Sequence, residues 1–135
     1  MARVIVLDAG VLIAANDPRD AHHASASAFI EAHAERGLAA PGVTLAETLV
    51  HAVPVGLLSD LLEDYEILGI QPLDVPGVAA GTIARIRAET RLRMPDALVV
   101  YVCEREQAEL ATTDHALAKV ATARGIPVHD LTRRE

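Results

Sequence analysis

The sequence has no tryptophan, one phenylalanine and two tyrosines among 135 residues, so aromatic side chains contribute little to its core or its surface. Proteins that bind single-stranded nucleic acid often stack bases on aromatic rings, and this chain offers few such rings. Its hydrophobic residues, 51% of the total, are therefore mainly Ala, Val, Leu and Ile. This composition suits closely packed helices on a small sheet, and the length predicts a single domain spanning residues 1–135.

Cysteine and lysine are almost absent as well. Cys103 is the only cysteine, which excludes an internal disulfide, and Lys119 is the only lysine. With 12 basic and 19 acidic residues, the chain has a net charge of −7. This charge argues against nonspecific binding to duplex nucleic acid, but not against an enzyme that meets phosphate through a carboxylate-held cation. Because signal-peptide and membrane-span patterns are also missing, we expect a cytoplasmic protein that does not contact a membrane.

Short apolar runs alternate with helical patterns along the whole chain. The first run, at residues 4–7, is rich in β-branched residues and predicts a strand that is buried on both faces. Further strands are predicted at 38–40, 69–73, 110–112 and 126–129, and helices at 11–15, between 20 and 37, at 43–53, 57–66, 78–91, from 94 onward, and at 116–124. This alternation predicts an α/β fold with a parallel sheet of about five strands and right-handed crossovers.

The predicted helix at 43–53 has an apolar face and a polar face. Its apolar face carries Ala46, Leu49, Val50 and Val53, while Thr44 and Thr48 lie on the other side. Glu47 falls at the edge of the apolar face. An acid at this position is either half-solvated or directed at something beside the sheet.

Four acidic residues occupy comparable places in this predicted fold. Asp8 follows the first strand, Glu47 lies on the helix after the second, Asp96 begins a helix, and Asp114 follows the fourth strand. In an open parallel sheet all four positions lie near the carboxyl ends of the strands, where ligands bind. The alternative interpretation is structural, because acids at such positions also cap helices.

Carboxylates that converge need a counter-charge. At about 5 Å, each ionised pair repels by roughly 3 kcal/mol at an effective dielectric constant of 20. A Mg²⁺ or Mn²⁺ ion would remove this conflict, because hard divalent cations prefer oxygen ligands. Such an ion could also activate water for attack on a phosphodiester.

The same residues carry a family resemblance. The segment Asp-Ala-Gly-Val-Leu-Ile at 8–13, Glu47, the segment Pro-Asp-Ala-Leu at 95–98 and the segment Thr-Thr-Asp at 112–114 resemble the four acidic motifs of the PIN-domain ribonucleases. The match covers nearly the whole chain, and its length is similar to that of the VapC toxins in this family. No single motif is specific, so the resemblance depends on the order and spacing of the set.

The resemblance implies a three-layer α/β/α fold and a Mg²⁺- or Mn²⁺-dependent endoribonuclease that acts as a toxin. It implies a cognate VapB-like antitoxin and a homodimer, which many Ala-rich helical surfaces also favour. By position, Asp8 and Asp96 would bind the metal directly, while Glu47 and Asp114 could act through water. Thr112 would add a hydroxyl nearby. Many relatives have Ser, Thr or Asn where this chain has Gly10, which leaves the orientation of Asp8 less well supported.

Arginines at 85, 87, 91 and 93 form the only basic concentration. A solvated helix face is the favoured interpretation of this group, although its place before Asp96 leaves room for phosphate contacts.

Two other functions remain open. The chain could be a non-catalytic PIN-like module that binds a protein partner, with its acids serving as helix caps. It could also be a phosphotransfer enzyme or a response-regulator-like switch. Lys119 lies within a helical pattern, and Gly10 stands where a phosphatase-type Asp-x-Asp pair has its second acid, so this last alternative is disfavoured.

Overall fold

The computed structural model describes residues 3–132 and contains one five-stranded sheet in that range. Its strands are β1 (Ile5–Leu7), β2 (Leu38–Pro41), β3 (Ile70–Leu73), β4 (Glu109–Thr112) and β5 (Val128–Asp130). They are ordered β3-β2-β1-β4-β5, and every pairing is parallel. The chain runs outward from β1 to β3 and then crosses back to β4, so the topological switch point lies between β1 and β4.

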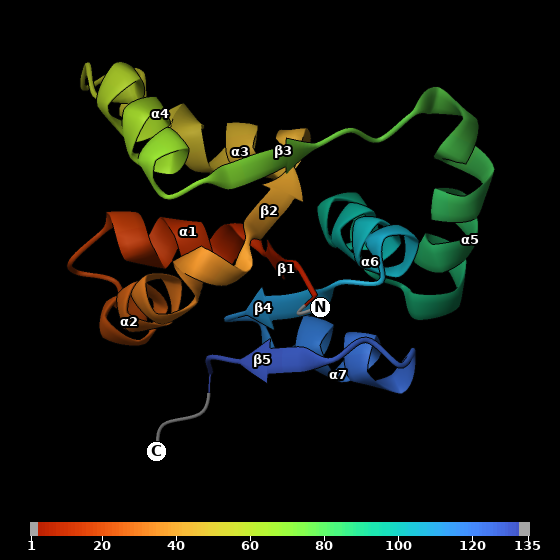
Figure 1. The fold of residues 1–135 in the computed structure, drawn as a ribbon. Helices are drawn as coiled ribbons and strands as arrows, with labels where there is room; N and C mark the ends of the chain where they lie inside the picture. The colour runs from red at the N-terminus through yellow and green to blue at the C-terminus, as the bar shows by residue number, and fades with distance from the viewer. Residues whose placement is uncertain (1–2, 133–135) are drawn as a thin grey trace.

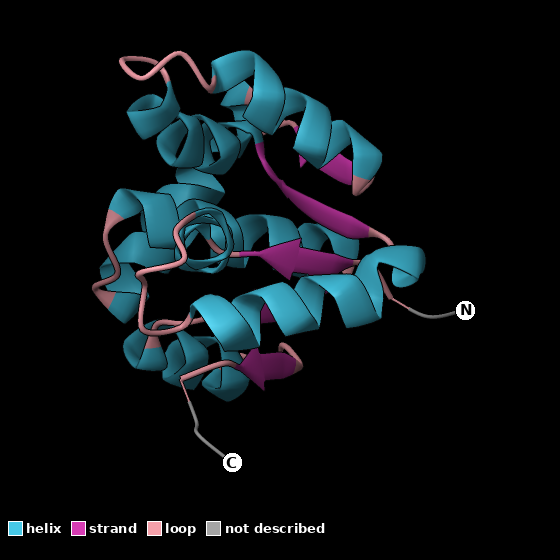
Figure 2. Cartoon of the chain, turned by 90° about the vertical axis from the view of Figure 1, so that its left-hand side faces the viewer, coloured by secondary structure: helices cyan, strands magenta, loops and turns pink. Residues whose placement is uncertain are grey.

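Seven α-helices connect and cover the strands within the described range. They are α1 (Ala9–Asn16), α2 (His23–His33), α3 (Gly42–Leu49), α4 (Leu58–Ile67), α5 (Ala80–Thr90), α6 (Met94–Glu106) and α7 (His115–Ala123). Figure 1 shows α1, α2 and α4 on one side of the sheet and α5 and α6 on the other. The strands lie between these helical layers, as Figure 2 also shows. The predicted three-layer α/β/α fold is therefore confirmed.

The core consists of two apolar clusters, one on each face of the sheet. One cluster joins the sheet to α5, α6 and α7 through residues such as Val6, Ile86 and Leu117. The other joins it to α1, α2 and α4 through residues such as Ile5 and Tyr65. All three residues of β1 are fully buried, because successive side chains of a central strand point into opposite clusters. The unbroken apolar run of the sequence is thus explained by burial on both faces.

The predicted orientation of the third helix is wrong. In the structure α3 buries Thr44, Leu45 and Thr48, whereas Val50 and Val53 are both 59% exposed. Burial of Thr48 is tolerated because its hydroxyl donates to the Leu45 carbonyl oxygen at 2.8 Å and forms a 2.8 Å hydrogen bond with the Tyr65 hydroxyl. The helix also ends at Leu49 and continues as a 3₁₀ turn, so a single helical period does not extend to residue 53.

Most other predicted elements are present, with boundaries that shift by one to three residues. The last strand lies at Val128–Asp130 rather than at 126–129.

No helix within residues 3–132 combines the length and the apolar character needed to cross a membrane.

Candidate active site

The four acidic residues selected from the sequence line one pocket of about 280 Å³. Asp8 directly follows β1, Asp114 lies two residues after β4, Glu47 lies on α3 after β2, and Asp96 lies in the first turn of α6. The remaining lining residues are Ala9, Gly10, Ile13, Thr44, Arg93, Pro95, Val99 and Thr113. The structure therefore brings all four acids together at the carboxyl edge of the sheet, beside the switch point between β1 and β4.

Asp8 is the most buried of these acids, with 6% of its surface exposed. Its backbone N–H donates to the Ala111 carbonyl oxygen at 3.0 Å, which extends the pairing of β1 with β4 by one residue. Its side chain makes no hydrogen bond that caps α1. Instead, Asp8 Oδ2 accepts a 2.7 Å hydrogen bond from the hydroxyl of Thr112, which is fully buried. The cap interpretation of Asp8 is therefore not supported by its side-chain contacts.

Thr112 links two of the four acids. Besides donating to Asp8, its hydroxyl oxygen accepts a 2.9 Å hydrogen bond from the backbone N–H of Asp114. A hydroxyl that donates in one direction and accepts in the other has a fixed orientation. Thr112 therefore holds the ends of β1 and β4 in register and fixes one oxygen of Asp8.

Burial and mutual repulsion both disfavour the ionised forms of two carboxyls. Burial raises the pKa of Asp8, the Thr112 hydroxyl opposes this rise, and the charges of Asp114 and Glu47 add to it. Burial likewise raises the pKa of Asp96, reinforced by Asp8 and Asp114 and opposed by Arg93. The four groups thus form one electrostatically coupled site, in which a cation would relieve repulsion.

Asp114 and Asp96 both sit at helix starts, but with different contacts. Asp114 is a true N-cap, because its Oδ1 accepts a 3.1 Å hydrogen bond from the Leu117 N–H in the first turn of α7. Asp96 lies one residue after Pro95, a residue type that favours the first helical turn. The helix dipole favours a negative charge at that position. A capping role for Asp114 leaves its second carboxylate oxygen outside the cap.

The donor set fits a hard divalent cation. Carboxylates and hydroxyls are the oxygen ligands that Mg²⁺ and Mn²⁺ prefer. Within residues 3–132, no three His, Cys, Asp or Glu side chains are already arranged as a metal cage. Magnesium does not require such a cage, because it retains several waters and commonly contacts only one or two protein carboxylates. The residues that could hold it are Asp8 and Asp96 directly, with Glu47 and Asp114 through water.

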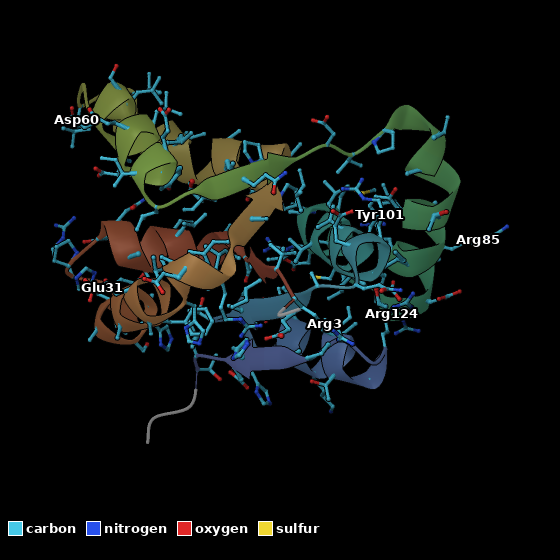
Figure 3. All side chains as sticks on the ribbon, viewed as in Figure 1. Arg3, Glu31, Asp60, Arg85, Tyr101 and Arg124 are labelled. Atoms are coloured by element: carbon cyan, nitrogen blue, oxygen red, sulfur yellow. The ribbon has the colours of Figure 1, made fainter. Side chains whose placement is uncertain are left out.

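Arg93 is the one basic residue among the described residues that line the pocket. It is the N-cap of α6, so the same turn that positions Asp96 also brings a guanidinium to the rim. The other arginines of the group lie elsewhere, and Figure 3 shows Arg85 pointing outward from α5. All four arginines are exposed, as expected for a solvated group, and Arg93 also borders the acids.

Larger hollows lie outside this site, one of about 620 Å³ along α7 and β5, one of about 770 Å³ between α1 and α4, and one of about 320 Å³ lined by α1, α2 and α4. Their acids, such as Asp130 and Asp60, are not buried. The buried polar side chains of the described range are Asp8, Thr44, Thr48 and Thr112, and all of these except Thr48 belong to the acidic pocket or contact it. The buried polar side chains are therefore concentrated at the acidic pocket, although it is smaller than the other hollows.

The sequence pattern does not single out two hydroxyl-bearing residues of the pocket, Thr44 and Thr113. The helical pattern places Thr44 on the polar face of its helix, and Thr113 is the middle residue of the segment at 112–114. Thr113 directly precedes Asp114, and Thr44 lies three residues before Glu47 on α3. Both are weak signals, because threonine is common in loops and at helix starts. Their position in the pocket depends on tertiary structure.

Several solved structures resemble this chain. A toxin–antitoxin complex from Klebsiella pneumoniae is 20% identical, with a TM-score of 0.73 over 94% of this chain and 97% of that chain. VapBC2 from Rickettsia felis, bound to a DNA fragment from their promoter, is 15% identical, with a TM-score of 0.69 over 94% and 98% of the two chains. FitAcB from Neisseria gonorrhoeae is 20% identical, with a TM-score of 0.67 over 96% and 99%. At these identities the likeness shows the fold alone.

Sequence comparison gives a more direct result. No curated protein matches the chain. The sequence profile of the PIN domain, however, matches residues 5–123, a range that includes all four acids of the pocket. Because this match extends over most of the sequence and agrees with the observed fold, the chain belongs to the PIN domain family.

Proposed function

We propose that this protein is a Mg²⁺- or Mn²⁺-dependent endoribonuclease that acts as the toxin of a toxin–antitoxin pair. The observation that carries the proposal is the convergence of Asp8, Glu47, Asp96 and Asp114 on one pocket, in which the pKa values of Asp8 and Asp96 are raised. Clustered carboxylates of this kind destabilise the fold unless a cation neutralises them, so their convergence favours a functional explanation.

The four acids have two kinds of role in the proposed site. Asp8, oriented by Thr112, and Asp96, placed at the start of α6, would contact the cation directly. Asp114, tied to the Leu117 N–H through Oδ1, and Glu47, on the exposed side of α3, would act through water. When bound, the cation supplies a water of lowered pKa and neutralises charge on the phosphate that is attacked.

Arg93 supplies a positive charge to the substrate side of the pocket. A guanidinium can bind a phosphate through two parallel hydrogen bonds, which suits the nucleic-acid backbone. The net charge of −7 makes such local neutralisation necessary, because the protein as a whole repels a polyanion. Arg93 would hold a phosphate next to the one that is cleaved, so that the scissile bond lies over the acids.

The proposed partners are an RNA substrate, a VapB-like antitoxin and a second copy of the chain. RNA is the substrate class that the resemblance to PIN-domain ribonucleases implies. A solved structure of the same fold is a toxin–antitoxin complex, which supports an antitoxin partner. The exposed valines at 43, 50, 53 and 55 leave an apolar surface around α3 that a protein partner could cover.

Mapping of newly formed RNA 5′ ends in cells tests the nuclease proposal. Cells would express the wild-type chain, Asp96→Asn or Asp74→Asn at equal soluble levels, since Asp74 is an exposed acid outside the pocket. We expect new ends with the wild type and Asp74→Asn but not with Asp96→Asn. Cleavage by purified protein should also require Mg²⁺ or Mn²⁺ and stop on addition of EDTA. Equal cleavage by Asp96→Asn would contradict the proposed role of the acids.

A non-catalytic module that binds a protein is the second candidate. The exposed apolar residues around α3 favour this alternative. The two functions differ in metal affinity. A nuclease site should bind Mn²⁺ and lose that binding in Asp96→Asn, whereas a module should show weak binding that Asp96→Asn does not change.

A further inference from the structure

Gly10 leaves a space in the acidic pocket that another residue fills. A Cβ atom added at Gly10 would lie 2.3 Å from the hydroxyl oxygen of Thr113, a distance that non-bonded atoms do not reach. The backbone does not explain the glycine, because its φ angle is not positive and because glycine destabilises a helix relative to alanine. The hydroxyl of Thr113 therefore occupies the space that a side chain at residue 10 would need.

The filled space faces the acids. The point where a Gly10 Cβ would stand is 3.7 Å from Asp8 Oδ2, so the Thr113 hydroxyl and the Asp8 carboxylate border the same small volume. Gly10 and Thr113 both line the pocket together with the four acids. Thr113 is half-buried, which leaves its hydroxyl open to water on the pocket side.

The two adjacent threonines have different hydrogen bonds. The Thr112 hydroxyl is fully used, because it donates to Asp8 and accepts from the Asp114 N–H. The Thr113 hydroxyl makes no hydrogen bond to any other residue in the range 3–132 that the structure describes. A hydroxyl that faces a set of carboxylates without a protein partner has both a donor and an acceptor available for a water molecule.

We propose that Thr113 is a positioning residue of the active site, whose hydroxyl, seated over Gly10, holds a water of the cation's hydration shell beside Asp8. A hydroxyl-bearing side chain at residue 10 would reach the pocket from α1. With Gly10, the hydroxyl comes instead from Thr113, at the end of β4. This inference rests on the proposed metal-dependent nuclease function. It assigns the specific oxygen that completes the site next to Asp8.

The first test compares two substitutions at Thr113. Thr113→Val keeps the size of the side chain and removes the hydroxyl, whereas Thr113→Ser keeps the hydroxyl. We expect Thr113→Val to lower kcat about tenfold with little change in KM, as expected for one lost hydrogen bond to a charged site. Thr113→Ser should stay within about threefold of the wild type on the same reasoning. Wild-type kcat for Thr113→Val would overturn the proposal.

A second readout does not depend on cleavage. Titration of Mn²⁺ followed by electron paramagnetic resonance should show weaker binding to Thr113→Val than to the wild type, by about fivefold, with Thr113→Ser close to the wild type. The melting temperature in EDTA should be the same for all three proteins, because the proposed hydroxyl acts only when the cation is bound. A hydroxyl that served only packing would instead change the melting temperature and leave the Mn²⁺ affinity unchanged. Unchanged Mn²⁺ affinity in Thr113→Val would also overturn the proposal.

Substitutions at Gly10 test whether a hydroxyl supplied from residue 10 can replace that of Thr113. Gly10→Ser alone should impair folding or activity, because its Cβ would collide with the Thr113 hydroxyl. The double variant Gly10→Ser/Thr113→Ala removes that hydroxyl and returns one from residue 10, and the Thr113 Cβ that remains is 3.7 Å from the added Cβ. We expect the double variant to bind Mn²⁺ and cleave RNA better than the matched control Gly10→Ala/Thr113→Ala, which fills the same space without a hydroxyl. Equality of the two double variants would show that packing alone matters.

The outcomes separate this inference from the function on which it rests. If the wild type neither binds Mn²⁺ nor cleaves RNA, both the proposed function and the role of Thr113 are wrong. If the wild type does both and the Thr113 variants match it, only the role of Thr113 is wrong. If the wild type binds Mn²⁺ but cleaves no RNA tested, the Mn²⁺ affinities of the variants still decide the role of Thr113.

Discussion

Replacement of Asp8 by asparagine should stabilise the metal-free protein while it abolishes activity. Asp8 is 6% exposed, and burial together with the charges of Asp114 and Glu47 raises its pKa despite the hydrogen bond from Thr112. Whenever Asp8 is ionised, the metal-free fold therefore holds its carboxylate in an unfavourable environment. Asparagine has nearly the same shape and can still accept the Thr112 hydrogen bond, so the substitution removes the charge with little change in packing.

The size of the effect follows from Coulomb's law. A pair of ionised carboxylates in one pocket repels by roughly 2 kcal/mol at an effective dielectric constant of 20, and the open pocket screens this value further. With Asp114 and Glu47 both acting on Asp8, the relief is about 2–3 kcal/mol. The weaker hydrogen bond from Thr112 to a neutral acceptor costs about 1 kcal/mol. The net gain of about 1–2 kcal/mol corresponds to an increase of about 3–8 °C in melting temperature for a chain of this size.

Thermal unfolding in EDTA at several pH values measures this gain. Because the pKa of Asp8 is raised on folding, the folded protein binds the Asp8 proton more tightly than the unfolded chain does. The stability contributed by the neutral carboxyl is complete below the unfolded pKa, and it is lost as the pH rises through the folded pKa. The difference between Asp8→Asn and the wild type should therefore be close to zero at acidic pH and should grow as the pH rises through the folded pKa. Asp74→Asn, which removes an exposed charge, is the matched control.

Addition of Mg²⁺ should reverse the order of stability. A ligand at 100 times its dissociation constant stabilises the folded state by about 2.7 kcal/mol, a gain that the wild type should show and Asp8→Asn should largely lose. A lower melting temperature for Asp8→Asn in EDTA at neutral pH would refute the reasoning. So would a gain that does not change with pH, because it could not come from ionisation of Asp8.

Three further outcomes are expected. Arg93→Ala should raise KM about tenfold with little change in kcat, whereas Arg85→Ala should change neither in steady-state kinetics. Tyr65→Phe should lower the free energy of unfolding by about 1–2 kcal/mol in urea titrations, because the buried Thr48 hydroxyl loses its 2.8 Å partner. Burial and neighbouring carboxylates raise the pKa of Asp96, so in the metal-free protein its carboxyl should titrate above the ordinary aspartate pKa of about 3.9 when it is followed by NMR in EDTA. Titration of the Asp96 carboxyl below that value would contradict the coupled-carboxylate site.

Much of the fold could be predicted because each strand has a local signature. The apolar β-branched run at residues 4–7 is too short for a helix and too apolar for a surface loop, and it forms the fully buried β1. Strand ends were less predictable, as at β5, because a strand of three residues is bounded by its hydrogen-bonding neighbour rather than by its own sequence.

The face of α3 could not be predicted from periodicity. A hydrophobic pattern places valines inward by default, but here Thr48 is inward and forms a hydrogen bond with the Tyr65 hydroxyl, and Thr44 is buried beside the acidic pocket. The hydrogen-bond partner Tyr65 lies 17 residues along the chain from Thr48, on another helix. The exposed Val50 and Val53 then require an explanation outside the monomer, which is consistent with the proposed protein partners.

The candidate site shows the same division between local and long-range information. Alternating strands and helices imply that acids after parallel strands lie at one edge, and this was sufficient to select Asp8 and Asp114. The close approach of these two acids depends on β4 pairing with β1, an adjacency that the sequence does not encode locally. The contact of Gly10 with Thr113 needs the same pairing, because it joins the start of α1 to the end of β4. Gly10 departs from the family pattern because it has no side chain beside Asp8. The Thr113 hydroxyl, from a distant segment, fills the space that Gly10 leaves, so the two residues form one structural feature.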